Sequence, residues 1–207
     1  MTGLCNGALK IDPDSEEALT MKGIALDFLG RDEEALEVVE AELARKKDDP
    51  VCLWTKARHL VGLGRENEAR EFVTMALKLK PDLYEAWQTK AAIHSNPGEA
   101  AEEAECYLAL ARMNPRNPFL WNQRAALLNK LNKPEEALEC CNEAIALGRN
   151  SILYRLNKGI LLERLGRYRE AIAAYDEALA LDPNDKRALD WKRNAIKLSR
   201  KGRWPRS

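Results

Sequence analysis

Apolar and small residues recur along the chain at helical spacing, and the whole pattern returns every 34 residues. It is clearest in residues 152–183, where two amphipathic helices are joined at Gly166 and the second ends at Pro183. Blocks of this kind begin at residues 16, 50, 84, 118 and 152, with no insertion between them. The pattern therefore predicts stacked pairs of antiparallel helices, in which each block packs mainly on its neighbours.

Three kinds of position within the block explain how its two helices turn and pack. The eighth and twentieth places carry Gly or Ala almost throughout, which lets two helices approach closely, and Glu103 is the exception at the twentieth place. Prolines such as Pro81, Pro115 and Pro183 end the second helix. The fifteenth place carries a residue suited to left-handed backbone: Gly30, Gly64, Gly98, Asn132 and Gly166.

The pattern predicts two helices in each block. First helices are expected at about 16–29, 50–63, 84–95, 118–131 and 152–165, and second helices at about 32–46, 66–80, 98–113, 134–147 and 168–181. The third block departs most, because Pro97 replaces the leucine found there in the other blocks. Its first helix should stop early, and Ala104 should take the packing role that Glu103 cannot fill.

The 34-residue period, the small residues and the closing prolines resemble the tetratricopeptide (TPR) repeat over essentially residues 1–200. The resemblance implies an all-α fold, a right-handed superhelical solenoid of antiparallel helix pairs. Five repeats are expected within residues 16–185, at 16–49, 50–83, 84–117, 118–151 and 152–185.

The two ends of the chain depart from the full repeat. Residues 1–15 contain only the second helix of a block, so this partial repeat either continues a longer array or acts as an unusual cap. Residues 186–207 are expected to form a C-terminal capping helix and a basic tail, with Leu189, Ile196 and Trp191 on its apolar side.

Charge is balanced overall but unevenly spread along the chain. Residues 1–50 hold 6 Lys/Arg against 13 Asp/Glu, whereas residues 186–207 hold 9 Lys/Arg against one acid. A neutral total argues against general nucleic-acid binding, although the basic end keeps a nucleic-acid-binding helical repeat as an alternative. The acidic start and basic end also predict a weak head-to-tail self-association.

The residues that usually carry catalysis are not brought together in this sequence. His59 and His94 fall in different blocks, and the five cysteines form no CxxC pair, so we expect neither a metal site nor a cofactor nor enzymatic activity. No apolar run approaches the ~20 residues of a membrane span. An odd number of cysteines without a disulfide framework favours a reducing, cytoplasmic location.

The seventh place carries a cation in every block: Lys22, Lys56, Lys90, Arg124, Lys158 and Lys192. The aliphatic stems can cover the seam between helices while the charges reach solvent or pair with acids of a neighbouring block. The alternative is a positive stripe that binds an acidic ligand. The sequence favours the first interpretation without excluding the second.

In the TPR family the concave surface is formed mainly by the first helices, at their second, fifth, sixth, ninth and twelfth places. This resemblance implies a peptide-binding surface of amides and hydroxyls beside apolar groups: Trp54, Thr55, Gln88, Thr89, Phe119, Asn122, Gln123, Leu153, Leu156, Asn157 and Ile160. The carboxylate clamp of co-chaperones is matched only by Asn157 and Arg187. We therefore expect a non-catalytic scaffold that binds an extended or helical segment of a protein partner, or else the scaffold part of a larger enzyme complex.

Overall fold

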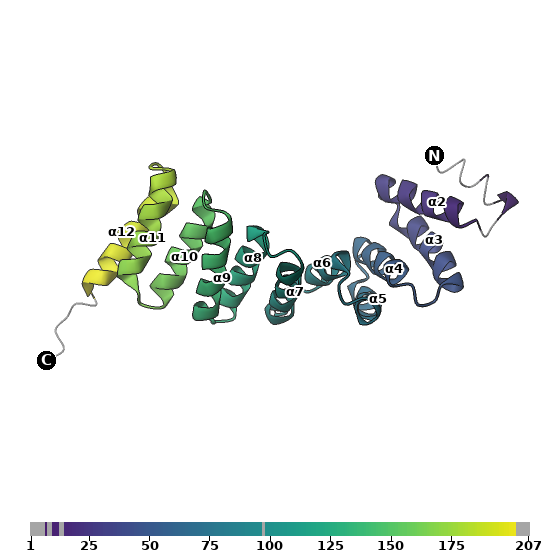
Figure 1. Ribbon diagram of the computed structural model, residues 1–207, viewed down its shortest axis with the longest axis horizontal. Helices are drawn as coiled ribbons and strands as arrows, with labels where there is room; N and C mark the ends of the chain where they lie inside the picture. The colour runs from purple at the N-terminus through teal and green to yellow at the C-terminus, as the bar shows by residue number, and fades with distance from the viewer. Residues whose placement is uncertain (1–6, 8–9, 13–14, 97, 202–207) are drawn as a thin grey trace. The chain divides into compact units, whose positions relative to one another are not determined.

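The computed structural model describes residues 7, 10–12, 15–96 and 98–201, and these form helices joined by short turns with no strand among them. Figure 1 shows that, within each of the two compact units of the chain, helices that follow one another in sequence lie side by side. The all-α helical-repeat fold predicted from the sequence is confirmed. The partial repeat expected within residues 1–15 lies largely outside the described residues.

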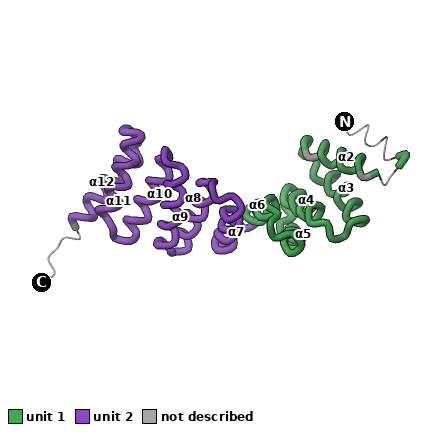
Figure 2. The backbone as a smooth tube through the Cα atoms, viewed as in Figure 1, with its two compact units in different colours: residues 1–93 green, residues 94–207 purple. Residues whose placement is uncertain are grey.

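Two compact units divide the chain, residues 1–93 and residues 94–207 (Figure 2). The first unit contains α2 (Glu16–Leu29), α3 (Asp32–Arg45), α4 (Pro50–Gly62), α5 (Glu66–Leu79) and α6 (Tyr84–Ile93). The second contains α7 (Ala100–Met113), α8 (Pro118–Lys130), α9 (Pro134–Leu147), α10 (Ile152–Arg164), α11 (Tyr168–Leu181) and α12 (Lys186–Lys201). Within each unit, consecutive helices pack on one another.

The turn inside each block is made by a residue with left-handed backbone, as the fifteenth place predicts. Gly30, Gly64, Gly98 and Gly166 have φ between 63° and 115°, and Asn132 has φ 59°. A residue with a Cβ is strained in this conformation unless it is Asn or Asp, which explains the residue types found there. The sequence therefore identifies the turns correctly.

The start of several first helices is fixed by a capping side chain. The Asp49 carboxylate accepts hydrogen bonds from the backbone N–H groups of Val51 and Cys52 at 2.9 and 2.8 Å. Asn117 caps α8 and Ser151 caps α10 in the same way. Each cap satisfies backbone donors that the first turn of a helix leaves without a partner.

Small residues form the contact between the two helices of a block. Ala57 and Ala69 are fully buried between α4 and α5, and Ala137 and Ala171 are fully buried in the second unit. At Gly159 on α10 even a methyl group would overlap the ring of Tyr175 on α11. A large aromatic core residue on one helix thus requires a glycine on the other.

The third block departs from the others as the sequence predicts. The helix α6 ends at Ile93 after 10 residues, whereas the first helices of the blocks on either side have 13. Ala104 is buried and Glu103 is half-buried, so Ala104 takes the packing position. The second helix begins at Ala100 rather than at residue 98, because Gly98 has φ 115° and cannot continue a right-handed helix.

The last helix differs from the prediction in the face that it buries. Ala188 and Ala195 are fully buried and Trp191 packs on the same core, but Leu189 is exposed. Ala188 and Ala195 are seven residues apart, two turns of helix, and therefore lie on one face that excludes Leu189. The prediction of Leu189 as a core residue was wrong.

Candidate functional site

The eleven residues predicted to bind a peptide fall into two sets, one in each unit. Trp54, Thr55, Gln88 and Thr89 lie on α4 and α6 of the first unit. The remaining seven lie on α8 and α10 of the second unit: Phe119, Asn122, Gln123, Leu153, Leu156, Asn157 and Ile160. The predicted surface is therefore divided between the two units.

In the first unit the predicted hydroxyl and indole groups bond to one another and to their own helices. The Trp54 indole Nε1 donates to the Thr89 hydroxyl at 2.9 Å, and that hydroxyl donates to the Glu85 carbonyl at 3.0 Å. The Thr55 hydroxyl donates to the Val51 carbonyl at 2.8 Å. The Trp54–Thr89 bond therefore joins α4 to α6, and the hydroxyls of Thr55 and Thr89 find hydrogen-bond acceptors in their own helices. Gln88 is exposed.

In the second unit two predicted asparagines form the equivalent contact between α8 and α10. The Asn157 amide Nδ2 donates to the Asn122 amide Oδ1 at 2.8 Å, and Asn122 is only 4% exposed. Trp54–Thr89 and Asn122–Asn157 both join a fifth-place residue to a sixth-place residue 35 positions later. Asn122 therefore contributes to the packing of α8 on α10 in addition to being a candidate for peptide binding.

The asparagine pair keeps one donor and one acceptor for a ligand. The bond between the two side chains uses Asn122 Oδ1 and Asn157 Nδ2, and in the described part of the chain neither side chain makes another hydrogen bond. Asn122 Nδ2 and Asn157 Oδ1 therefore have no hydrogen-bond partner among the described residues, and neither atom is fully buried, although Asn122 as a whole is only 4% exposed. A donor beside an acceptor matches the C=O and N–H groups of an extended peptide backbone.

Leu156 was predicted to accept an apolar side chain of a partner, but it lies in the core. Its side chain is 0% exposed and belongs to the apolar cluster shared by α8 to α12. Leu156, at the fifth place of α10, points toward the neighbouring helices. The next residue, Asn157, is partly exposed instead. The prediction for Leu156 was wrong.

Phe119 and Leu153, at the second places of α8 and α10, are the exposed apolar residues of the predicted set. They are 52% and 47% exposed, while Ile160 and Gln123 are half-buried. Phe119 and Leu153 thus occupy equivalent places of their helices, and neither belongs to the buried core. They remain candidates for contact with a partner.

A pocket of about 230 Å³ lies beside the asparagine pair. Asn157 and Ile160 of α10 line it together with Ala126, Asn129 and Lys130 of α8. Ala126 and Asn129 occupy the ninth and twelfth places that the family resemblance indicates, yet they were not among the predicted residues. The sequence gave no reason to select them, because alanine and asparagine are frequent on helix surfaces.

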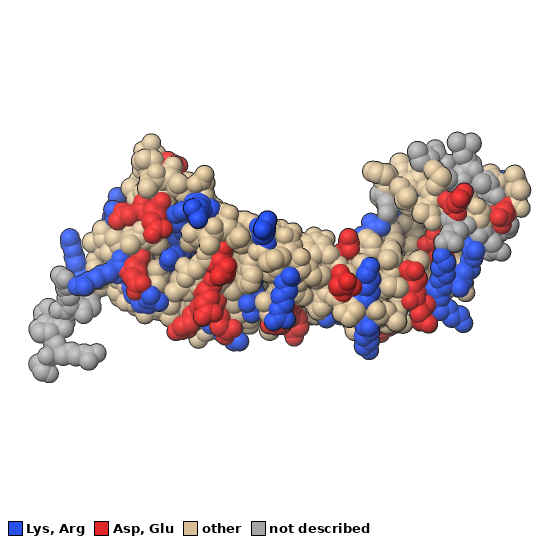
Figure 3. Space-filling model, viewed as in Figure 1, with Lys and Arg blue, Asp and Glu red and all other residues tan. Residues whose placement is uncertain are grey.

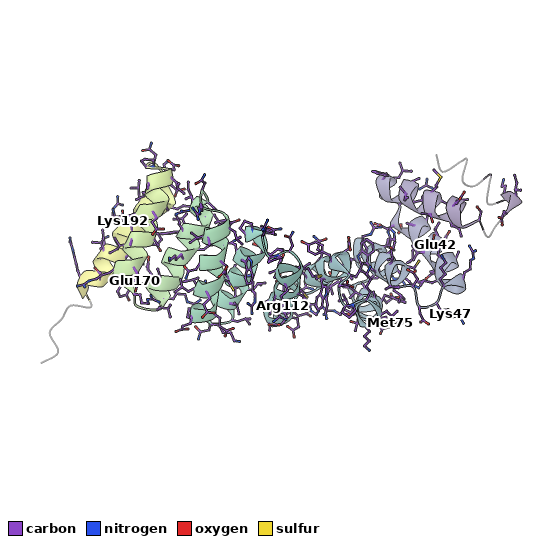
Figure 4. All side chains as sticks on the ribbon, viewed as in Figure 1. Glu42, Lys47, Met75, Arg112, Glu170 and Lys192 are labelled. Carbon is purple, nitrogen blue, oxygen red and sulfur yellow. The ribbon has the colours of Figure 1, made fainter. Side chains whose placement is uncertain are left out.

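A second pocket, of about 410 Å³, lies in the first unit and is lined by residues of α2, α3 and α4. Val38 and Val39 of α3 line it together with Ile24 of α2 and with Val51 and Trp54 of α4. The carboxylate of Glu42, labelled in Figure 4, accepts a long hydrogen bond from the Cys52 thiol at 3.7 Å. Of the pocket residues, Trp54 and Thr55 were predicted and the α2 and α3 residues were missed.

The seventh-place cations cover the seam where an acid is available to them. Lys56 Nζ lies 2.7 Å from a Glu40 carboxylate oxygen and 4.4 Å from the Phe72 ring centre. Lys192, labelled in Figure 4, pairs with Asp176 at 2.5 Å. Arg124 instead donates to the Cys140 sulfur at 3.6 Å. These contacts agree with the interpretation of the cations as seam residues.

Among the described residues, the cysteines and histidines are not arranged for nucleophilic catalysis. Burial, aided by Asp49 and Glu42, raises the pKa of the Cys52 thiol to about 12, and burial raises that of Cys141 to about 12. His59 Nδ1 lies 2.8 Å from Asp32 Oδ1, and His94 Nδ1 lies 2.7 Å from Glu99 Oε2, in separate units. Among the described residues no three His, Cys, Asp or Glu side chains form a metal site.

A family model described as the tetratricopeptide repeat matches residues 118–151 and 153–185. Residues 118–185 of the chain therefore contain two tetratricopeptide repeats. A second model, the protein prenyltransferase alpha subunit repeat, matches residues 100–131. None of the described helices is both long and apolar enough to cross a membrane.

Solved tetratricopeptide-repeat structures share this fold at low sequence identity. MamA from Desulfovibrio magneticus RS-1 is 19% identical, with 84% of this chain and 98% of that chain covered and a TM-score of 0.67. A MamA AMB-1 structure is 20% identical over 86% of this chain and 98% of that chain, with a TM-score of 0.71. YrrB, described as a TPR protein with an unusual peptide-binding site, is 21% identical over 80% and 94%, with a TM-score of 0.59. A search of the curated proteins finds no match.

Proposed function

We propose that this protein is a scaffold that binds an extended segment of a protein partner across α8 and α10. The segment would lie over the asparagine pair and the adjacent pocket, with its apolar side chains on Phe119, Leu153 and Ile160. YrrB, which shares the fold, is described as having a peptide-binding site, and such a use of this fold is consistent with the proposal.

One observation carries the proposal: Asn122 Nδ2 and Asn157 Oδ1 have no hydrogen-bond partner among the described residues, while the two side chains hold each other in place. A hydrogen bond between two side chains fixes their orientation before a ligand arrives, so less side-chain freedom is lost on binding. The open donor and acceptor then read the backbone rather than the sequence of the peptide. Phe119, Leu153 and the pocket supply the sequence preference.

The test separates the proposed surface from other exposed apolar groups. A peptide-display selection against the whole chain should yield segments with two or more large apolar residues. A Phe119→Ala/Leu153→Ala variant should lose at least tenfold in affinity for such a peptide, as expected for two exposed anchors at about 1 kcal/mol each. Its far-ultraviolet circular dichroism should be unchanged because neither side chain belongs to the core.

The matched control removes similar exposed leucines from second helices. Leu147 on α9 and Leu181 on α11 are 39% and 40% exposed. A Leu147→Ala/Leu181→Ala variant should bind the selected peptide as the wild type does. Equal losses in both double variants would refute the proposed surface.

A second candidate function is the scaffold part of an enzyme complex. The match of residues 100–131 to the prenyltransferase alpha subunit repeat favours it, because that repeat belongs to a subunit of an enzyme. Purification of the tagged chain from its native cell would then retain a catalytic subunit in equal amount. If only substoichiometric partners are retained, this candidate fails.

We also propose a reducing, cytoplasmic location for the chain. Cys52, Cys106, Cys140 and Cys141 form no disulfide, although Cys140 and Cys141 are adjacent in sequence. An oxidising compartment would expose such thiols to mispairing during folding. Fractionation of the native cell tests the location directly.

A further inference from the structure

The outer face of α12 carries a row of exposed cations. Ala188 and Ala195 bury the opposite face in the core of the second unit. Lys186, Arg193, Lys197 and Arg200 are exposed and follow one another at intervals of 7, 4 and 3 residues, which places them on one side of a helix. We call these four residues the basic row.

Little in the chain neutralises the basic row. The helix α12 contains seven Lys or Arg residues and one acid, Asp190. Arg193 pairs with Asp190 at 3.1 Å, but Lys186, Lys197 and Arg200 form no ion pair within the described residues. Figure 3 shows basic side chains over this end of the second unit, with acidic side chains between them. The row is thus an open cationic surface about 21 Å long, given a rise of 1.5 Å per residue.

The outer face of α3 carries the complementary charges. Glu33, Glu37 and Glu40 are exposed, while Ala35, Val38 and Val39 bury the other side of the helix. The intervals of 4 and 3 residues equal those between Arg193, Lys197 and Arg200. Glu40 pairs with Lys56, whereas Glu33 and Glu37 have no partner within the described residues. We call these three residues the acidic row.

The two units carry opposite net charge. Residues 1–93 contain 18 Asp/Glu against 13 Lys/Arg, and residues 94–207 contain 15 against 20, so the units carry −5 and +5. Approach of the second unit of one copy to the first unit of another is therefore attractive at low ionic strength. The chain itself supplies a charge partner for its basic row.

We propose that the basic row on α12 of one copy docks along the acidic row on α3 of a second copy. The two helices lie parallel, so that Arg193, Lys197 and Arg200 face Glu33, Glu37 and Glu40. Each copy uses two different surfaces, which makes the contact heterologous and leaves both ends of an assembly able to grow. This contact is independent of the peptide surface proposed on α8 and α10.

Sedimentation of the whole chain over a range of concentrations tests the contact. At about 20 mM salt the average mass should rise with concentration, and at about 500 mM salt the rise should disappear because exposed charges are screened. A constant monomer mass at low salt would overturn the proposal. A salt-dependent change of shape at constant mass would also overturn it, since the rows would then meet within one copy.

Charge reversal identifies the rows. Lys197→Glu/Arg200→Glu and Glu33→Lys/Glu37→Lys should each weaken association at least tenfold, because attraction becomes repulsion. An equimolar mixture of the two variants should associate again, since each reversed row then meets an opposite row on the other variant. Failure of the mixture to associate would refute the pairing of these rows.

The matched control and the competing ligand complete the design. Glu139 and Glu143 on α9 are exposed and unpaired within the described residues, so Glu139→Lys/Glu143→Lys should leave association unchanged. Loss of association in this control would show that general charge, not α3, is responsible. A DNA duplex of about 20 base pairs is the competing ligand. If the duplex binds, blocks association, and no longer binds the Lys197→Glu/Arg200→Glu variant, the basic row is a nucleic-acid site and the proposed contact is refuted.

Discussion

At the scale of single residues, Gly159 and Tyr175 show how the repeat controls its spacing. Tyr175 is fully buried and its hydroxyl donates to Glu163 at 2.8 Å, while its ring fills the space that a Cβ at Gly159 would occupy. Gly159→Ala should therefore destabilise the chain by about 1–3 kcal/mol, as overpacking of a core does. The shift of the urea unfolding midpoint of the second unit measures this cost.

The control for Gly159 is Gly23, which occupies the same eighth place in the first unit. A Cβ there would lie 3.7 Å from Val38 Cγ1, an ordinary contact. Gly23→Ala should be neutral or stabilising by up to about 1 kcal/mol, because alanine favours helix more than glycine does. Equal destabilisation by both substitutions would show that Tyr175 is not the cause.

Asn122 supplies a second prediction at this scale. Because it is buried and bonded to Asn157, Asn122→Ala should cost about 1 kcal/mol of stability in addition to any loss of binding. Gln123→Ala, which alters the next residue of the same helix, should leave the melting temperature unchanged. Thermal unfolding of the two variants decides, and an unchanged Asn122→Ala would contradict the burial.

The peptide surface was predictable from the sequence only in part, and the asparagines show why. The period and the family resemblance indicate which places of a first helix turn inward. They do not tell whether Asn122 meets a ligand or Asn157, because that depends on the distance between α8 and α10. Leu156 was misplaced for another reason: places 5 and 6 differ by 100° around the helix, and Leu156 at place 5 lies in the core.

At the scale of elements, turns and caps explain most helix boundaries and were the most predictable features. Gly98 moves the start of α7 to Ala100, a boundary that depends on one backbone angle and was missed. The face of α12 was missed because alanines, not the larger Leu189, pack on α11. A prediction based on the positions of large apolar residues does not detect a face where two helices approach closely through alanines.

The start of α12 gives a prediction about pH. The Asp185 carboxylate accepts from the Ala188 N–H at 2.9 Å, and this bond together with Arg187 holds the pKa of Asp185 below its usual value. Because the pKa of Asp185 is lower in the folded state, its ionised carboxylate stabilises the helix fully at pH values above the ordinary pKa of 3.8. This stabilisation is lost as the pH falls through the lower pKa of the folded state. Amide protection in the first turn of α12 should therefore fall in this acid range.

Two variants of Asp185 separate the cap from its charge. Asp185→Ala should lower amide protection of the first turn of α12 at neutral pH, since it removes the acceptor. Asp185→Asn keeps an acceptor without a titrating group, so its protection should be nearly independent of pH in the acid range. Hydrogen exchange measures both, and a persistent pH dependence in Asp185→Asn would assign the effect to another group.

At the scale of the whole molecule, the division into two units falls inside the third block. The boundary between Ile93 and His94 coincides with the early end of α6. In a repeat array stability is distributed over blocks and their interfaces, so a shortened helix weakens its own block first. Amides of residues 94–106 should exchange before those of α4 and α8, and uniform protection would contradict this.

A substitution at residue 97 tests whether the sequence of the third block causes this weakness. The corresponding residues in the other full blocks are Leu29, Leu63, Leu131 and Leu165. Proline has no backbone N–H to donate to a helical hydrogen bond, and it disfavours helical backbone at the residue before it. Pro97→Leu should therefore allow α6 to continue beyond Ile93, raise helicity slightly and slow exchange of residues 94–106 about tenfold. Pro81→Leu, which replaces a proline between blocks, is the control and should produce no such gain. If Pro97→Leu leaves exchange unchanged while the region still opens first, the weakness lies in Glu103 and the packing of α7, not in the proline.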